Sequence, residues 1–286
     1  MLIPRPILLV FVDGLGWPAG RLEESLYAGC PALCRLLRGH AVPLETVLGV
    51  EGLPQSATNQ TVIMTGRNAP LECGRHIEGF PVQQLRAMLE EDNLFLRFVR
   101  AGRRAVFANA YVRFPGASMP LIYRSVSTVS TLAAFGGTLG REELLAGLAV
   151  CHDLTREHLP EHGITDVPVI SEEMAAEHLW AAAAPVDFCL FEYFLTDHAG
   201  HRGDQARQMA VLASLDRFLA ALLAHQPPGA LLLLVSDHGN IEAPETRRHT
   251  ANPVPWVAVG PGEEAARRGM GSLLEVFPRI LSLAGL

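Results

Sequence analysis

An acid and a histidine stand side by side at Asp237-His238, separated by one residue from the apolar run ALLLLV. Eleven residues later the chain supplies another histidine, His249, in the stretch HTANPVP. Carboxylate oxygens and imidazole nitrogens are common ligands of divalent metal ions in proteins. The pattern therefore indicates a metal site beside the end of a buried strand.

Two further apolar runs end in the same residue types. Asp13 follows residues 7–12, and Asp197 and His201 follow residues 186–194. The spacing of four between Asp197 and His201 places both side chains on one face of a helical turn. Together with Asp237, His238 and His249 they make six ligands. That number is too large for one tetrahedral zinc ion and suits two divalent metals, zinc or manganese, that share a site.

The segment GLPQSATNQTVIMTG, residues 52–66, offers hydroxyl groups that such a centre could activate. A helix is expected to run to Gly66, with Ser56 at its N-cap position. The free N–H groups of a helix start favour a phosphate, and a serine beside a divalent cation can ionise and attack phosphorus. Ser56 is therefore either a capping residue or a nucleophile. Thr58 and Thr61 compete with it, and Thr61 ranks last because it lies more than a turn into the helix.

The apolar runs themselves are continuous and do not alternate with polar residues. They cover residues 7–12, 105–111, 186–194, 230–237 and 255–260. Continuous runs of this length are typical of strands that are covered on both faces, as in a parallel sheet. In open parallel sheets, ligands gather at the carboxyl ends of the strands. The candidate ligands are therefore expected at one edge of a sheet.

Helical patterns separate these runs. They cover residues 81–102, with a break near Asp92-Asn93, and residues 171–184, 204–225 and 272–286. Strands that alternate with helices predict a doubly wound α/β fold with a mostly parallel sheet. Residues from about 112 to 168 are rich in Ser, Thr, Gly and Pro. We expect them to form an insertion or small cap within one domain that spans residues 1–286.

Composition excludes several classes of partner. The net charge is −7, so nucleic acid is not expected as a partner. The five cysteines are scattered, which argues against a disulfide framework, and all 23 basic residues are arginine, so no lysine can act in catalysis. No segment approaches the roughly 20 apolar residues that span a bilayer, and the N-terminal apolar run is interpreted as a strand and not as a signal peptide. A cytoplasmic protein without membrane contact is expected.

The order of the motifs resembles that of the alkaline phosphatase superfamily of two-metal enzymes. DHGNIE and HTANPVPWV are most similar to the branch that contains cofactor-independent phosphoglycerate mutase and phosphopentomutase. The resemblance covers the first 70 residues and residues 186–286. It implies Ser56 as the nucleophile, ten residues before Gly66, and Asn59 as a contact of the phosphoryl group. It implies two metal sites, one formed by Asp13, Ser56, Asp237 and His238 and the other by Asp197, His201 and His249.

The sequence also departs from that branch. The mutase has a long inserted domain and a lysine near its metals, whereas this chain has only about 120 residues between its two motif blocks and no lysine. Arg113 and Arg124 are the candidates for a substrate clamp. Glu192 and His198 are expected to support the ligands or the fold.

We therefore expect a two-metal phosphoric ester hydrolase that acts on a small phosphorylated metabolite through a phosphoserine. The alternatives are a phosphomutase or a phosphodiesterase with the same site, and a metal-binding protein without catalysis.

Overall fold

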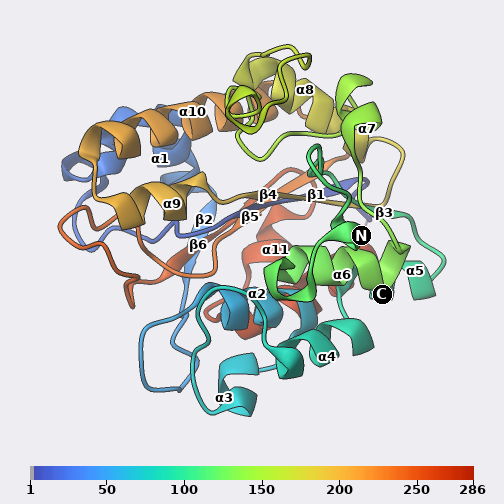
Figure 1. Cartoon of the computed structure of the whole chain (residues 1–286). Coiled ribbons are helices and arrows are strands. Elements are labelled where there is room, and N and C mark those ends of the chain that lie inside the picture. Colours follow the sequence, from blue (N-terminus) through green and yellow to red (C-terminus); the bar gives the residue numbers. More distant parts are fainter. Residues whose placement is uncertain (1–2) are drawn as a thin grey trace.

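A six-stranded sheet forms the centre of the computed structural model, which describes residues 3–286 (Figure 1). The strands lie in the order β2-β6-β5-β1-β4-β3. Their bounds are β1 Ile7–Val12, β2 Ala41–Leu44, β3 Ala105–Phe107, β4 Phe188–Tyr193, β5 Leu231–Val235 and β6 Val254–Val259.

The sheet is mostly parallel, as expected for an α/β fold. β3, β4, β1 and β5 are parallel neighbours, β6 is antiparallel to β5, and β2 is antiparallel to β6. The sequence did not predict β2, which is a short, partly exposed edge strand containing Pro43. The direction of β6 was also not foreseen, because burial on both faces gives the same apolar run in either direction.

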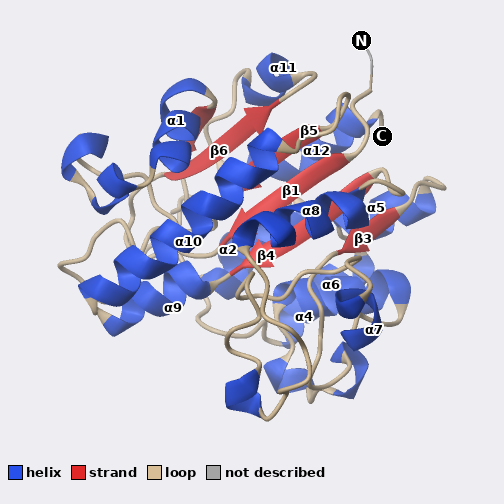
Figure 2. Cartoon of the chain, turned by 90° about the horizontal axis from the view of Figure 1, so that it is seen from above, coloured by secondary structure: helices blue, strands red, loops and turns tan. Residues whose placement is uncertain are grey.

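Helices cover both faces of the sheet (Figures 1 and 2). They are α1 Pro31–Gly39, α2 Ser56–Thr65, α3 Ala69–Cys73, α4 Gln83–Glu91, α5 Leu94–Arg100, α6 Val126–Phe135, α7 Arg141–Leu145, α8 Glu172–Ala183, α9 Leu195–Arg202, α10 Gln205–Ala224, α11 Glu263–Arg267 and α12 Val276–Ala284. Short 3-10 helices are η1 Leu22–Glu24, η2 Leu26–Gly29, η3 Gly116–Ser118, η4 Leu121–Tyr123, η5 Pro160–His162 and η6 Leu273–Glu275. None of the helices in residues 3–286 combines the length and apolarity needed to cross a membrane.

Local sequence signals fix several helix boundaries. The break predicted near Asp92-Asn93 separates α4 from α5, and the Asn93 side chain caps α5 by accepting a hydrogen bond from the Leu96 N–H. Ser171 caps α8 in the same way through the Met174 N–H. These caps satisfy N–H groups that a helix start leaves without a partner.

The alternating side chains of each central strand enter two separate cores. Leu8 and Val10 of β1 pack with α1, α8 and α10, whereas Ile7 and Leu9 pack on the opposite face with α2, α4, α5 and α12. Each buried side chain of this size contributes about 1.5–3 kcal/mol. Burial on both faces explains why the strands appear in the sequence as unbroken apolar runs.

One edge of the sheet collects the loops that matter for chemistry. Asp13 follows β1 directly, α9 follows β4, and β5 leads into Asp237. Because β6 is antiparallel to β5, residues 236–253 turn back at this same edge and bring His249 with them. β2 also ends here, and the chain runs on to Ser56 at the start of α2.

Residues 112–168 contain α6, α7 and η3 to η5. α6 packs against α4 and α5 and lies in the helix layer of α2 (Figure 1). Further along, Leu144, Cys151, Leu159 and Val167 form a small apolar cluster of their own. The segment therefore combines a helix of the main layer with a locally packed loop region.

Candidate metal centre

Two groups of possible metal ligands meet at the carboxyl edge of the sheet. Within each group, the possible ligand atoms all lie within 4.8 Å of one another. One group is buried and consists of Asp13, Asp237 and His238; the other is more exposed and consists of Asp197, His201 and His249. A third group in the described chain, Glu173, Glu177 and His225, lies apart from this edge on the exposed surfaces of α8 and α10.

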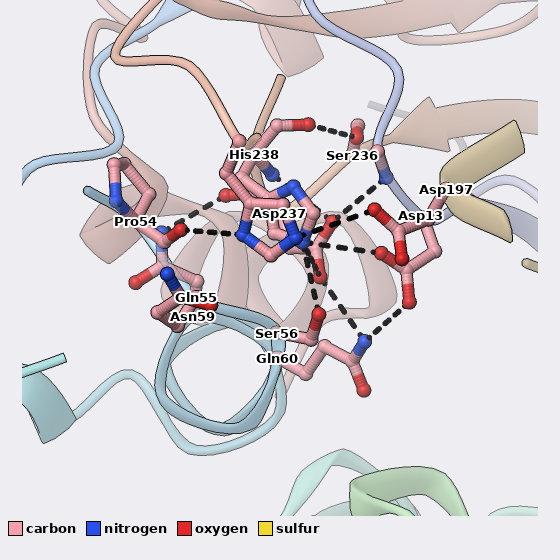
Figure 3. Close-up of polar contacts among 12 residues, drawn as sticks. Asp13, Pro54, Gln55, Ser56, Asn59, Gln60, Asp197, Ser236, Asp237 and His238 are labelled. Carbon is pink, nitrogen blue, oxygen red and sulfur yellow. Dashed lines mark hydrogen bonds and ion pairs between the residues drawn. The ribbon is translucent and has the colours of Figure 1, made fainter. Parts of the chain in front are cut away.

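In the buried group, the His238 ring faces two carboxylates (Figure 3). Its Nε2 atom lies 3.2 Å from Asp13 Oδ1 and 3.5 Å from Asp237 Oδ2. Asp13 Oδ1 is buried and has no hydrogen-bond partner among residues 3–286. A buried carboxylate oxygen without a donor is costly, and a cation would remove that cost.

In the second group, two histidine rings point their Nε2 atoms at each other. The His201 Nε2 and His249 Nε2 atoms are 3.0 Å apart, and they lie 3.3 and 3.4 Å from the carboxylate oxygens of Asp197. Asp197 and His201 lie one turn apart on α9, as their spacing predicted. The geometry of the group is that of three donors around a common point.

Backbone carbonyls determine which nitrogen of each ring is free. The Nδ1 atoms of His201, His249 and His238 lie 2.9, 2.9 and 3.3 Å from the carbonyl oxygens of Arg247, Pro54 and Gly239. A carbonyl only accepts, so each Nδ1 carries the proton and each Nε2 presents a lone pair. Two lone pairs at 3.0 Å repel unless a positive charge lies between them. This donor set therefore fits a divalent cation in each group.

Electrostatics leads to the same conclusion. Burial raises the pKa of Asp13 well above its ordinary value, and the carboxylates of Asp237 and Asp197 raise it further. Burial also acts to raise the pKa of Asp197, but its contacts with the imidazole rings of His201 and His249 lower that pKa overall. The bond to Asp197 in turn raises the pKa of His201 to about 9. The three carboxylates of the two groups concentrate negative charge in one place, and a divalent cation in each group would compensate it.

Gly14 lets the two groups approach each other. It has a φ of +72°, and a Cβ atom there would lie 2.8 Å from Asp197 Cβ. The rings of His238 and His249, one from each group, stack with centroids 3.7 Å apart. The two groups therefore form one continuous site.

Gln60 and Asn240 hold the carboxylates in place, and neither was predicted from the sequence. Gln60 Nε2 donates to Asp13 Oδ2 at 3.1 Å and to Asp237 Oδ2 at 3.0 Å (Figure 3). Asn240 Nδ2 donates to Asp197 Oδ1 at 2.6 Å. The polar run SATNQT, buried from its second residue onward, was the signal that could have identified Gln60.

Replacing Gln60 by alanine is expected to weaken metal affinity about 10- to 100-fold, because its amide orients both carboxylates of the buried group. Affinity can be measured by competition with a chromophoric chelator. Gln205→Ala, at an exposed position of α10, is the matched control. Equal affinity in the Gln60 and Gln205 variants would contradict a role for Gln60 in holding the ligands.

Ser56 lies beside the buried group. It is the first residue of α2, and Gln55 occupies the N-cap, so the expectation of a capping position for Ser56 was wrong by one residue. The Ser56 hydroxyl instead faces His238 Nε2 at 2.9 Å (Figure 3). A hydroxyl that is not used for capping, at the positive end of a helix, is available for chemistry.

The competing hydroxyls are engaged elsewhere. Thr58 Oγ1 donates to the Gln55 carbonyl at 3.1 Å, and Thr61 Oγ1 donates to the Ala57 carbonyl at 2.7 Å. Both side chains are fully buried. Of the three hydroxyls, only Ser56 reaches the candidate centre.

Asn59 departs from the role that the resemblance implied. Its amide donates to the carbonyl oxygens of Thr46 and Asp237, both at 2.9 Å, and the residue is fully buried. The amide hydrogens that would contact a phosphoryl group are therefore already used. In this structure, Asn59 anchors the backbone that carries Asp237.

A cavity of about 680 Å³ opens over the site and is lined by Ser56, Asp197, His201 and His249. Arg247 and Arg248 also line it, and neither forms an ion pair with a carboxylate in residues 3–286. Two free guanidinium groups give the opening a positive charge that suits an anionic substrate. Neither arginine was predicted from the sequence.

The arginines proposed from the sequence lie elsewhere. Arg124 donates to the carbonyl oxygens of Met119 and Ala117, so its guanidinium is held by the backbone. Arg113 lies 5.2 Å over the Phe114 ring and lines a different cavity. Neither contributes to the lining of the cavity above the candidate metal ligands.

Glu192 and His198 lie close to the site without joining either ligand group. Burial raises the pKa of Glu192 to about 7, although a hydrogen bond from Ser127 opposes the shift. Burial lowers the pKa of His198, whose ring packs edge-on against Phe194. The supporting roles expected for both residues remain predictions.

Comparisons with known proteins identify the family of this chain. A family model described as the metalloenzyme superfamily matches residues 141–286, just over half of the chain. The 2,3-bisphosphoglycerate-independent phosphoglycerate mutase of Cereibacter sphaeroides is 36% identical over 128 residues, which are 42% of this chain and 25% of that relative. The chain spans about a quarter of the length of the curated relatives it matches.

Two solved structures are similar over nearly the whole chain. The PH0037 protein from Pyrococcus horikoshii matches with a TM-score of 0.60 and 16% identity, and covers 100% of this chain and 98% of its own. The alkaline phosphatase from the Antarctic bacterium TAB5 matches with a TM-score of 0.59 and 12% identity, over 99% and 98%. At these identities the likeness concerns the fold.

Proposed function

We infer that this chain, which belongs to the metalloenzyme superfamily, is a two-metal phosphoric ester hydrolase. Within that superfamily it lies near the phosphoglycerate mutase branch of alkaline-phosphatase-like proteins. The reaction would cleave a phosphomonoester of a small metabolite through a phosphoserine on Ser56. The observation that carries the proposal is the position of the Ser56 hydroxyl. The hydroxyl oxygen lies 2.9 Å from His238 Nε2, and Ser56 lines the same cavity as Asp197, His201 and His249.

The proposal assigns the ligands to two divalent cations, zinc or manganese. One would be held by Asp13, Ser56, Asp237 and His238, and the other by Asp197, His201 and His249. When bound, such cations neutralise phosphate charge and lower the pKa of a coordinated hydroxyl.

The protein's own groups account for the bond changes. Ser56 Oγ attacks phosphorus as its proton leaves to solvent, and a new O–P bond forms. The ester P–O bond breaks, and the departing alkoxide takes a proton from solvent to become the alcohol. The free N–H groups at the start of α2 bind the phosphoryl oxygens. Arg247 and Arg248 attract the anion into the cavity. Water then cleaves the phosphoserine, which releases phosphate and restores the hydroxyl.

Phosphate release from nitrophenyl phosphate is the test of the proposed reaction. The purified protein should bind about two metals per chain and release phosphate in zinc or in manganese, and EDTA should abolish the release. Restoring the metal should restore the rate. A protein that binds two metals but releases no phosphate from any ester would refute the hydrolase.

A phosphomutase is the second candidate, because the curated relatives are phosphoglycerate mutases. The difference lies in the second step, where the phosphoryl group returns to the substrate and not to water. Comparing phosphate release with the formation of an isomerised phosphate ester separates the two reactions. The lack of lysine in this chain and the open cavity at Arg247-Arg248 favour hydrolysis.

A phosphodiesterase would use the same metals and nucleophile. It would act on bis-nitrophenyl phosphate faster than on nitrophenyl phosphate, whereas the proposed monoesterase should show the reverse order. The two substrates can be compared at equal concentrations in the same metal.

A further inference from the structure

A second cavity of about 410 Å³ lies at the carboxyl ends of β3 and β4. Aromatic side chains are prominent in its walls, namely those of Phe80, Phe107, Tyr111, Phe114, Tyr123 and Phe194. We propose that this cavity binds a flat aromatic group of the substrate, which is the alcohol part of the phosphate ester. The inference rests on the proposed function for the phosphoryl site and adds the class of substrate.

The cavity and the phosphoryl site are neighbours on the same edge of the sheet. Glu192 of β4, which lines the aromatic cavity, pairs in register with Phe11 of β1, two residues before Asp13. Adjacent strands lie about 4.8 Å apart, so the two sites are one strand apart.

Two short segments contribute to both cavities. Gly79 lines the phosphoryl cavity and the next residue, Phe80, lines the aromatic one. Phe194 lines the aromatic cavity, and Asp197 lines the phosphoryl cavity three residues further along. A single substrate can therefore place its phosphoryl group against Ser56 and its organic group against these rings.

The rings at the rim are available for stacking. Phe80, Phe114 and Tyr123 are 47%, 56% and 54% exposed, although large apolar side chains usually lose water contact on folding. Phe80 and Tyr123 meet edge to face, with centroids 6.0 Å apart. A flat ring inserted between such walls gains burial and aromatic contact together.

Polar groups give the cavity a preference among aromatic compounds. Arg113 lines it and forms no ion pair with any carboxylate in residues 3–286. The Tyr111 hydroxyl is bonded to Thr128 at 2.6 Å and is less available. The volume lies within the range of about 300–1,000 Å³ that small-molecule sites occupy. An aromatic ring with a hydrogen-bond acceptor or anionic substituent near Arg113 fits best.

The first test uses 2-naphthol, which has the aromatic part without the phosphate. It should bind to the metal-free protein, as followed by its fluorescence, and bind about tenfold more weakly to Phe80→Ala and to Tyr123→Ala. Phe114→Ala is an independent variant at a third rim position. Leu71→Ala, at a position 60% exposed on α3 and away from the cavity, is the control and should bind as the wild type does.

The second test asks whether the cavity serves the reaction. 2-Naphthol should inhibit the release of phosphate from nitrophenyl phosphate competitively, and the rim variants should weaken the inhibition by the same factor as the binding. Failure of 2-naphthol to bind, binding unchanged in all three rim variants, or inhibition that does not compete with substrate would each overturn the inference. Because the binding test needs no turnover and no metal, its result is independent of whether the hydrolase itself is found.

Discussion

Replacing Ser56 by alanine is expected to lower phosphate release by about 10⁴-fold while leaving the metal content near two per chain. The hydroxyl is the only one of the three in its segment that faces the metal ligands, at 2.9 Å from His238 Nε2. Without it no phosphoserine can form, and water must attack the ester directly. Initial rates with nitrophenyl phosphate and metal analysis of the same samples give both quantities.

Thr58→Val is the matched control for this variant. Valine keeps the shape of a buried side chain whose hydroxyl bonds only to backbone groups, Gln55 O and Ile77 N. Its turnover should stay within a few-fold of the wild type. Acid quenching during turnover should trap phosphoprotein in wild type and Thr58→Val but not in Ser56→Ala. A Ser56→Ala protein with a tenth of the normal rate would exclude serine as the nucleophile.

The strands that were predicted correctly are those with the least ambiguous sequences. β1, β4 and β5 are buried on both faces, so they appear as long apolar runs that no amphipathic helix would produce. β2 was missed because one short edge strand has neither a run nor an alternation to recognise. Strand direction also escaped prediction, since it depends on pairing with β5 and not on the composition of β6.

The candidate metal ligands could be predicted from the sequence in those cases where the end of a strand fixes a residue's position. Asp13 follows β1 directly, Asp237 lies two residues after the end of β5, and His201 is placed by a single turn of α9. Arg247, Gln60 and Asn240 were missed because their positions depend on contacts between distant segments. Gln60, for example, meets Asp237 across 177 residues of sequence. The spacing of residues within one segment cannot predict such a contact, although a buried polar side chain in a helix indicates that it has a hydrogen-bond partner.

The same reasoning explains why Asn59 differs from its expected role. A family pattern assigns a role to a residue from its position on the helix, and here that position is one turn after the expected nucleophile. The structure shows that this position in α2 faces the Thr46 and Asp237 carbonyls and is fully buried. A role carried over from a motif is therefore reliable only where the surrounding hydrogen bonds leave the group free.

His201→Ala is expected to remove about one metal per chain and to lower phosphate release by about 10³-fold. His201 supplies one of the three donors of the more exposed group, and its ring is oriented by the bond from Nδ1 to the Arg247 carbonyl. The ring is partly exposed, so its loss should cost little folding stability. The buried group keeps all its ligands, so one metal should remain. Metal analysis and phosphate release, each measured across a range of zinc concentrations, report the two effects.

His225→Ala is the control that makes this result specific. His225 also lies beside two carboxylates, Glu173 and Glu177, but that group is wholly exposed and lies away from the sheet edge. At that exposed position water and dissolved ions compete with a metal for the side chains, so a tight metal site is not expected. The variant should keep its metal content and its rate of phosphate release. If His225→Ala lost metal while His201→Ala kept it, the assignment of the second metal to Asp197, His201 and His249 would be wrong. Comparing the two variants thus tests what a metal centre requires. We expect it to require imidazole rings held in a fixed orientation at the sheet edge, and not only acids and histidines that lie close together.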